Sequence, residues 1–588
     1  MYWLSATTFR QIDCFNFLLF CQTIPLKKIV TDMDASLAVR NTGFAKSALS
    51  FILLFSIGLF GYLLPAFGNF TMIPGDLGDA RFNSVILEHG FQWLTGQAGH
   101  LWSPSFFYPF ERVLGLSDNH FGSLWSYSLL RSLGLPREMA YSGWYIFGFL
   151  LNFLACGWVL RQAKFSPLAS ALGAFVFTLA LPVLHQEGHA QLVYRFAIPV
   201  ACFCWYQALV LRDKVSFAQA IFWCAVQFMC SIYLGVFLVY CLTAMVLACW
   251  LLRLFGQLHY PDKDSLVVVG ITNSEILTQK RTDLSPRTWL WYAAALGGIV
   301  FVFLLLRQYK MIAADYQLTR PIDDLRSLIP GLHSYLLADN SGLTRWVGSW
   351  LAYFPTRSEH QLFLGIGVLF FSVWGACITH LGRVFFVTLL LLVGLTTMVA
   401  DQSLYLWLLK IPGFDAIRAV SRIILVMLFP VAVLVAIGVD RLLQPRFPWG
   451  MMSRGLLVVA IVASLTLETV YYVPHHAAVQ TWQDRQRGLR SLIKDTMPSD
   501  TILFVTQRQT EPFYITELDA MIYAQDNRLA TLNGYSGSTP PGYVYPDPCL
   551  PSDVRLQGYF ALRGVPEAKQ KELLNRLRVL ALEACAKQ

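Results

Sequence analysis

The chain has 588 residues, of which 55% are hydrophobic and only 14% are charged, and its formal net charge is +9. Soluble domains carry about 25% charged residues, so this chain has too few charges to cover the surface of a soluble protein. Its 45 basic residues are spread along the whole sequence, which argues against a nucleic-acid partner. The 17 Trp and 25 Tyr residues suit many membrane–water interfaces. The composition therefore predicts a polytopic membrane protein.

Eleven stretches are long and apolar enough to cross a bilayer, which takes about 20 helical residues. A twelfth apolar segment, 120–134, is too short, and we expect it to lie as a helix partly in the membrane interface. The predicted fold is therefore mainly α, a membrane helix bundle of about 11 spans. The spans are expected at 48–67, 139–160, 165–183, 192–211, 216–233, 234–254, 288–307, 360–379, 383–400, 421–440 and 455–473.

The Lys and Arg residues of the short loops predict which side each loop occupies, since cytoplasmic loops carry the excess of positive charge. Placing the N-terminal segment 1–46 in the cytoplasm puts the basic, otherwise plain loops there as well. The other side then receives the first outer loop, 68–138, and a second large outer loop, 308–359. It also receives the tail from residue 474, so the acidic residues and histidines gather on that side.

The composition changes near residue 474, after the transmembrane domain 47–473. The segment 474–588 is polar, and it contains a strand-like run at Thr501–Val505 and a turn-rich stretch at 533–543. Its last part, 567–584, has the apolar periodicity of an amphipathic helix. We expect a small α/β domain on the outer side.

The 12 cysteines do not form a disulfide framework, because half of them lie inside apolar runs where a thiol packs as a small hydrophobic group. Cys549 and Cys585 are the only cysteines after residue 474. Since both are expected in an oxidising compartment, we predict a disulfide between them.

The first outer loop carries the richest group of acidic residues, in the sequence PGDLGDARFNSVILEHG from Pro74 to Gly90. Asp76 and Asp79 stand beside two glycines, and Glu88 and His89 follow. If Asp79 caps a helix, the residues after it form an amphipathic helix on the membrane surface. A glycine–aspartate turn with a helix cap is the structural alternative for either aspartate. The accumulation of carboxylates favours a catalytic site in this loop. We expect Glu88 and His89 to contact the substrate.

A second polar group, HQEGHAQLVYR, stands at the mouth of a span. Ionisable groups there are costly unless they face water or each other. His185 and His189 have the i, i+4 spacing at which two imidazoles can reach one metal, but Glu187 has the wrong offset for a zinc-hydrolase motif. We favour a polar lining for a substrate cavity, made by these three residues and Arg195. A zinc hydrolase and a solvated turn are the alternatives.

A third group, IPGFDAIRAVSR at 411–422, places Arg418 and Arg422 on one face near the start of a helix. Positive charge there opposes the helix dipole, so local stability does not explain the two residues. A bound anion such as phosphate would explain them. The alternative is that both side chains reach out to the membrane interface. In the second large outer loop, Arg320 is a further candidate for substrate binding.

Five segments together resemble a known family. They are GDLGDARFNSVILEH (75–89), FFYPFERVLGLSDNHFG (106–122), GHAQLVYRFAIP (188–199), PGFDAIRAVSRIILV (412–426) and NGYSGSTPPGY (533–543). With the many spans and the outer C-terminal domain, they resemble the GT-C superfamily of membrane glycosyltransferases, which use lipid-phosphate sugar donors.

The resemblance implies a function and a place in the cell. In GT-C enzymes an acidic residue of the first outer loop deprotonates the acceptor hydroxyl or holds a metal. Asp79 is the best match to this residue, and Asp76 is the second. Arg418 and Arg422 would meet the donor phosphate. The implied reaction is hexosyl or pentosyl transfer, with inversion, from a polyprenyl-phosphate-linked sugar to a periplasmic glycan, lipid or protein. The implied location is a bacterial inner membrane, with a cytoplasmic N-terminus and a periplasmic C-terminus.

Metal use stays open at this point, because the motif is Asp-Leu-Gly-Asp and not an adjacent acidic pair. If a cation takes part, Mg²⁺ or Mn²⁺ held by Asp76 and Asp79 is expected.

Two other functions fit the same architecture. A non-catalytic transporter or assembly factor could use the polar cavity to bind a lipid-linked glycan. Transporters usually carry polar residues at mid-membrane and repeated halves, whereas this chain gathers its polar residues at the outer face, with Glu468 near the end of the last span as an exception. A receptor or scaffold acting through the C-terminal domain would leave the outer-loop acids without a role.

Overall fold

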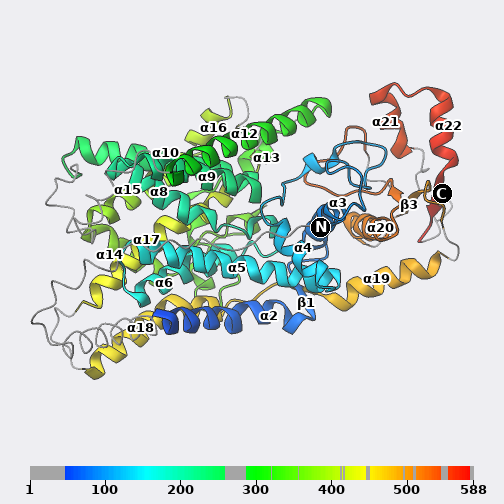
Figure 1. The fold of residues 1–588 in the computed structure, drawn as a ribbon. Helices are drawn as coiled ribbons and strands as arrows, with labels where there is room; N and C mark the ends of the chain where they lie inside the picture. Colours follow the sequence, from blue (N-terminus) through cyan, green and yellow to red (C-terminus); the bar gives the residue numbers. More distant parts are fainter. Residues whose placement is uncertain are drawn as a thin grey trace, which may run out of the picture.

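The computed structural model describes residues 47–258, 286–318, 321–354, 356–410, 414, 417–444, 451–493, 497–506, 511–543 and 554–582. A bundle of long helices occupies one end of the molecule, and a smaller part with helices and short strands occupies the other (Figure 1). Helices α3 (Asp79–Leu94) and α4 (Leu124–Ser132) lie between the two. Helix α4 falls inside the interfacial segment expected at 120–134.

All eleven expected spans coincide with apolar helices among the described residues. Eight of these are long enough to cross a membrane: Ser47–Ala66, Arg137–Gln162 (α5), Pro167–Leu184 (α6 and α7), Ala190–Leu211 (with α8, Ala197–Leu211), Ile232–Leu254 (α10), Thr288–Asp315 (within α12, Pro286–Asp315), Val420–Leu442 (with α17, Ile424–Leu442) and Met452–Val470 (within α18, Met451–Val470). Three are shorter: Lys214–Cys230 (α9), Ile366–Ile378 (α14) and His380–Thr396 (α15). The prediction of a mainly α, polytopic helix bundle is confirmed.

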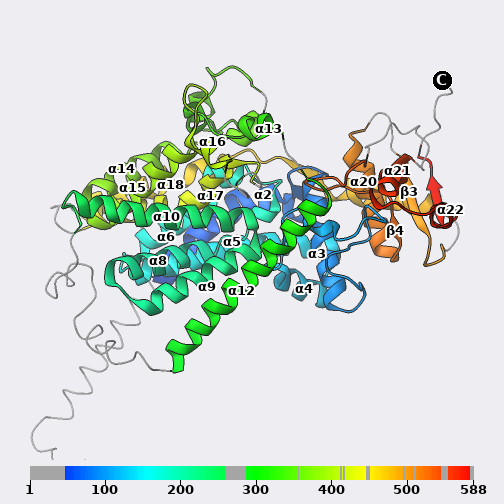
Figure 2. The same ribbon diagram turned by 90° about the horizontal axis from the view of Figure 1, so that it is seen from above.

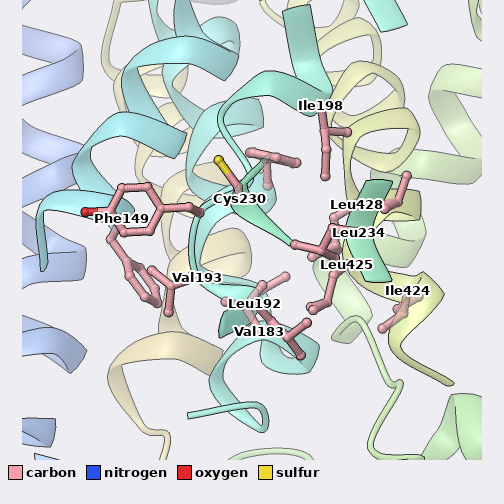
Figure 3. Packing of buried hydrophobic residues seen from close by; sticks show 14 of the residues in the cluster. Phe149, Val183, Leu192, Val193, Ile198, Cys230, Leu234, Ile424, Leu425 and Leu428 are labelled. Atoms are coloured by element: carbon pink, nitrogen blue, oxygen red, sulfur yellow. The ribbon is translucent and has the colours of Figure 1, made fainter. Parts of the chain in front are cut away.

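Helix α17 is the centre of the bundle, since 94% of the apolar stretch of its span is buried. Helix α12 crosses the outside of the bundle, and only 11% of the apolar stretch of its span is buried (Figure 2). Leu425 and Leu428 of α17 pack in one cluster with Ile198 of α8 and Leu234 of α10 (Figure 3). A β-carbon at Gly375 of α14 would come 2.1 Å from the carbonyl oxygen of Leu434. Only glycine therefore allows α14 to approach α17 this closely.

The part that follows residue 474 is built on a three-stranded parallel sheet in the order β4 (Ala530–Thr531), β3 (Ile502–Val505), β5 (Leu577–Leu580). Strand β3 is buried and matches the expected strand at 501–505. The helices of this part are α19 (Val479–Leu492), α20 (Phe513–Asn527), α21 (Val554–Arg563) and α22 (Glu567–Asn575).

The helix expected at 567–584 is wrong in its second half. Helix α22 ends at Asn575, and Leu577–Leu580 form β5, which pairs with β3 along its whole length. Backbone pairing with a buried strand outweighs the apolar periodicity that predicted a continuous helix. The expected disulfide partners, Cys549 and Cys585, lie outside the described residues.

Two connections join the first outer loop to this C-terminal part. Strand β1 (Met72–Pro74) pairs antiparallel with β2 (His476–Ala478), so that Met72 faces Ala478. The fully buried Arg81 of α3 places its guanidinium 2.5 Å from Asp519 of α20. These contacts fix the start of α3 between the bundle and the C-terminal part.

Candidate functional site

Five side chains from five separate segments meet where the helix bundle faces the C-terminal part. His189 lies at the centre: its Nδ1 is 2.9 Å from Oδ2 of Asp79, and its Nε2 is 3.1 Å from Oε1 of Glu359. Arg422 donates to the same Oε1 of Glu359 at 2.7 Å. The hydroxyl of Tyr535 donates to Oδ1 of Asp79 at 2.8 Å. We call these five residues the acid–histidine cluster.

Asp79 owes its position to the turn that begins α3. Oδ1 of Asp76 accepts a hydrogen bond from the backbone N–H of Gly78 at 2.8 Å. Gly78 is the residue that precedes the helix, so Asp79 is the first residue of the helix. The expectation from the sequence that Asp79 caps the helix is therefore wrong. A carboxylate in the first turn is favoured by the helix dipole.

A close backbone approach brings the histidine loop to this turn. Gly75 has a positive φ of 81°, and a β-carbon there would lie 2.6 Å from the α-carbon of Gly188. Only a residue without a side chain fits in this position. His189 follows directly and so reaches Asp79.

The electrostatics of the cluster favour a protonated histidine between two carboxylates. Burial and the neighbouring Arg422 lower the pKa of His189, but Asp79 and Glu359 more than offset them, and the pKa is raised above 6.5. Burial raises the pKa of Glu359, yet Arg422 and His189 bring it well below its ordinary value. Burial likewise raises the pKa of Asp79, while hydrogen bonds from His189 and Tyr535 leave it lowered.

The geometry around Nε2 of His189 allows two proton arrangements. This atom lies 2.9 Å from a guanidinium nitrogen of Arg422, which can only donate. A neutral ring would accept from Arg422, whereas a protonated ring would donate to Glu359. In both arrangements Nδ1 can keep its proton toward Asp79.

The C-terminal part supplies Tyr535 through a buried polar network. The carboxylate of Glu517 accepts from the backbone N–H of Gly534 at 2.8 Å and from the side chain of Asn533 at 3.0 Å. It also forms an ion pair with Arg555 at 2.6 Å, and both partners are almost completely buried. This network holds the chain next to Tyr535, so that its hydroxyl reaches Asp79.

Of the two expected phosphate-binding arginines, only Arg422 belongs to the cluster. The side chain of Arg418 is exposed, and its backbone N–H donates to the hydroxyl of Tyr233 at 3.1 Å. The guanidinium of Arg422 lies 5.7 Å over the ring of the same tyrosine. Arg418 is therefore an exposed neighbour of the cluster that contacts it through Tyr233, whereas Arg422 is a buried member of the cluster.

His185 and Glu187 have partners other than the cluster. The segment that follows Leu184 is a turn and not a helix, so the i, i+4 spacing does not bring His185 beside His189. His185 packs against Tyr472, and burial lowers its pKa to about 3. Glu187 accepts from the backbone N–H of His475 at 2.7 Å, and burial raises its pKa to about 8.

Three other expected substrate-binding residues make internal contacts. Glu88 pairs with Arg131 at 2.8 Å, and Nε2 of His89 lies 2.9 Å from the carbonyl oxygen of Leu101. Both contacts join α3 to the rest of the first outer loop. The buried guanidinium of Arg195 donates to two carbonyl groups of α6. These contacts explain all three residues structurally, and their role in substrate binding stays a prediction. Arg320 lies outside the described residues.

The aspartates do not present a ready cation site. Both oxygens of Asp79 already face Tyr535 or His189, and one oxygen of Asp76 closes the turn before α3. In the part of the chain that the structure describes, no group of three or more His, Cys, Asp or Glu residues is arranged to hold a metal ion. The described residues thus show no preformed site for the expected Mg²⁺ or Mn²⁺, and the use of either cation stays a prediction.

The sequence analysis missed Glu359 and Tyr535. Glu359 directly precedes the expected span 360–379, and the criterion applied to 185–195, ionisable groups at the mouth of a span, would have found it. Tyr535 belongs to the segment 533–543, but nothing in that segment singles out a tyrosine that contacts an aspartate 456 positions away.

Comparisons with known proteins give weak similarities. No family profile and no curated protein matches the sequence. Among solved structures, the chain is similar to the arabinofuranosyltransferase AftD from Mycobacteria, with 14% identity and a TM-score of 0.39, over 80% of this chain and 29% of that one.

It is also similar to the oligosaccharyltransferase of Archaeoglobus fulgidus, with 11% identity, in its apo form (TM-score 0.41) and in complex with Zn and sulfate (TM-score 0.42). These two matches cover 83% and 82% of this chain, and 64% and 62% of the matched chains. The chain thus spans less than two thirds of each matched protein. At these values the similarities carry no functional argument, which has to come from the site.

Proposed function

We propose that the protein is a membrane glycosyltransferase that moves a sugar from a polyprenyl-phosphate donor to an acceptor hydroxyl, with inversion. The observation that supports this most is the setting of Asp79. Its carboxylate has a lowered pKa and a side chain that is 31% exposed, and it is oriented through both oxygens. The lowered pKa keeps the carboxylate ionised at neutral pH but makes it a weaker base. Its accessible and fixed position therefore supports the proposal, because geometry comes before pKa in judging a general base.

The proposed reaction is a single displacement. Asp79 takes the proton of the acceptor hydroxyl while the acceptor oxygen bonds to the anomeric carbon of the donor. The bond from that carbon to the phosphate oxygen breaks, and its electron pair leaves with polyprenyl phosphate. One carboxylate base suffices, because no covalent enzyme intermediate has to form as in a retaining glycosidase.

The other members of the cluster would position the base and the donor. His189 holds Asp79 in place, and Glu359 holds His189 while neutralising the buried Arg422. The exposed Arg418 is the better candidate for the donor phosphate, because Arg422 is already bonded to Glu359. Charge-assisted hydrogen bonds from arginine suit a phosphate group.

The test is a transfer assay with the full-length protein in lipid nanodiscs. Polyprenyl-phosphate hexoses and pentoses with a radioactive sugar serve as donors, and the envelope glycan, lipid and protein fractions of the source cells serve as acceptors. We expect Asp79→Asn to abolish label transfer, and Asp339→Asn, a control in the second large outer loop, to retain it. Loss of transfer in Asp76→Asn together with transfer by Asp79→Asn would give the role of base to Asp76. Transfer by neither the wild type nor any variant would refute the enzyme and favour a non-catalytic transporter or assembly factor.

A further inference from the structure

Three aromatic rings of the C-terminal part gather beside the candidate base. The rings of Tyr514 and Tyr535 have centroids 5.8 Å apart, and the ring of Phe513 lies 6.4 Å from that of Tyr535. Phe513 is 38% exposed, and the two tyrosines are partly exposed. We call these three residues the aromatic shelf.

The shelf is fixed relative to Asp79. Tyr535 donates to the aspartate itself, and its ring stands edge-on to Phe82 of α3 at 5.6 Å. A β-carbon at Gly78, the residue before Asp79, would come 3.1 Å from the ring of Tyr514. The helix that begins with Phe513, α20, is tied to α3 through the buried ion pair of Arg81.

The two oxygens of Asp79 face different parts of the protein. Oδ2 lies toward His189 of the bundle, and Oδ1 accepts from Tyr535 of the C-terminal part. Arg418, the candidate for the donor phosphate, belongs to the bundle. A donor held by the bundle would therefore approach Asp79 from one side and leave the side of the shelf to the acceptor.

We propose that the aromatic shelf binds a sugar ring of the acceptor, which makes the acceptor a carbohydrate. The electron-rich face of an aromatic ring attracts partly positive hydrogen atoms. The C–H groups on one face of a sugar ring provide such hydrogen atoms. The exposed carboxylate of Asp76 lies beside Gly78, as the ring of Tyr514 does, and it can accept sugar hydroxyls. A lipid chain has no hydroxyl groups that could donate to this carboxylate. The choice of acceptor over donor rests on the proposed function.

The test measures glycan binding separately from transfer. Full-length protein in nanodiscs is incubated with the fluorescently labelled glycan fraction released by mild acid from the envelope of the source cells, and the retained glycan is quantified. We expect Tyr514→Ala and Phe513→Ala each to weaken retention about three- to tenfold, the range that corresponds to one lost aromatic contact. Tyr514→Phe, which keeps the ring, should retain glycan as the wild type does.

Tyr353→Ala is the matched control, because Tyr353 is a tyrosine of the second large outer loop that is 84% exposed. It should leave retention unchanged. Glycan retention is measured without any donor, so that a failure of the transfer chemistry is distinguished from a failure of the shelf. The proposal is overturned if the wild type retains no glycan, or if Tyr514→Ala and Phe513→Ala retain as much as the wild type or lose no more than Tyr353→Ala.

Discussion

The substitution Glu359→Gln tests whether the acid–histidine cluster is a buried, coupled group of charges at the end of the bundle that faces the C-terminal part. Gln has nearly the same shape as Glu, so the change removes a negative charge and leaves packing almost intact. It deprives Arg422 of its ion-pair partner and leaves the guanidinium next to His189, 2.9 Å from Nε2. Either His189 stays protonated and two positive groups face each other with only Asp79 to balance them, or His189 becomes neutral and Asp79 loses the charge that pairs with it.

The size of the effect follows from burial. The side chains of Arg422 and Glu359 are only 6% and 14% exposed, so water screens their interaction little. Removing one partner of a buried ion pair typically costs about 3–5 kcal/mol, because the remaining charge stays buried and uncompensated. The pair Arg357–Asp339 provides a comparison in the same outer loop. It is bidentate at 2.7 and 2.8 Å, but it is less buried, with Arg357 12% and Asp339 36% exposed, so water screens it more and its loss should cost less.

The assay compares the thermal unfolding of Glu359→Gln and Asp339→Asn in identical nanodiscs. Unfolding is measured as the loss of the monodisperse peak on size-exclusion chromatography after heating. We expect the melting temperature to fall further for Glu359→Gln than for Asp339→Asn, because the Arg422–Glu359 pair is the more buried of the two. If Glu359→Gln is no less stable than the control variant, the cluster is not the buried, coupled group described above.

Three further predictions concern the same site. Arg418→Gln should weaken binding of a polyprenyl-phosphate sugar by about 1.5–3 kcal/mol with little change in melting temperature, and an unchanged donor KM would remove Arg418 from the donor site. Because the pKa of His189 is raised above 6.5, its stabilising charge is fully present below pH 6.5 and is lost as the pH rises through the raised pKa. The melting temperature should therefore fall over that range in the wild type, and His189→Gln should lack this step. Tyr535→Phe removes a hydrogen bond that lowers the pKa of Asp79, so the acid limb of the pH–rate profile should move to higher pH, and an unmoved limb would separate Tyr535 from the base.

The membrane part of the fold was predictable because its signal is local. A stretch of about 20 apolar residues has no alternative in a bilayer but a helix, and each of the eleven expected spans coincides with a described apolar helix. The C-terminal part was predicted less well for the opposite reason. Leu577–Leu580 has the periodicity of a helix, but it pairs with β3 more than 70 positions earlier, and no local pattern reports such a partner.

The candidate site was predictable only where its residues stood out in their own segments. Asp79, His189 and Arg422 each belong to a local excess of charge at the mouth of a span, and the structure brings these three together. The spacing rule that grouped His185 with His189 failed because the chain turns after Leu184.

Charge balance links the cluster to the choice of Arg418 for the donor. With His189 protonated, the negative charges of Asp79 and Glu359 equal the positive charges of His189 and Arg422, and every one of these groups has an oppositely charged neighbour within 3.1 Å. In such a neutral cluster no positively charged side chain is left to bind a phosphate. A phosphate bound to Arg422 would bring a second negative charge next to Glu359. A donor phosphate is therefore best met outside the cluster, where Arg418 stands exposed beside Tyr233. In this neutral cluster the charge of Asp79 is paired with that of His189 before the reaction. When Asp79 accepts the proton of the acceptor it becomes neutral, and His189 can then interact more strongly with Glu359.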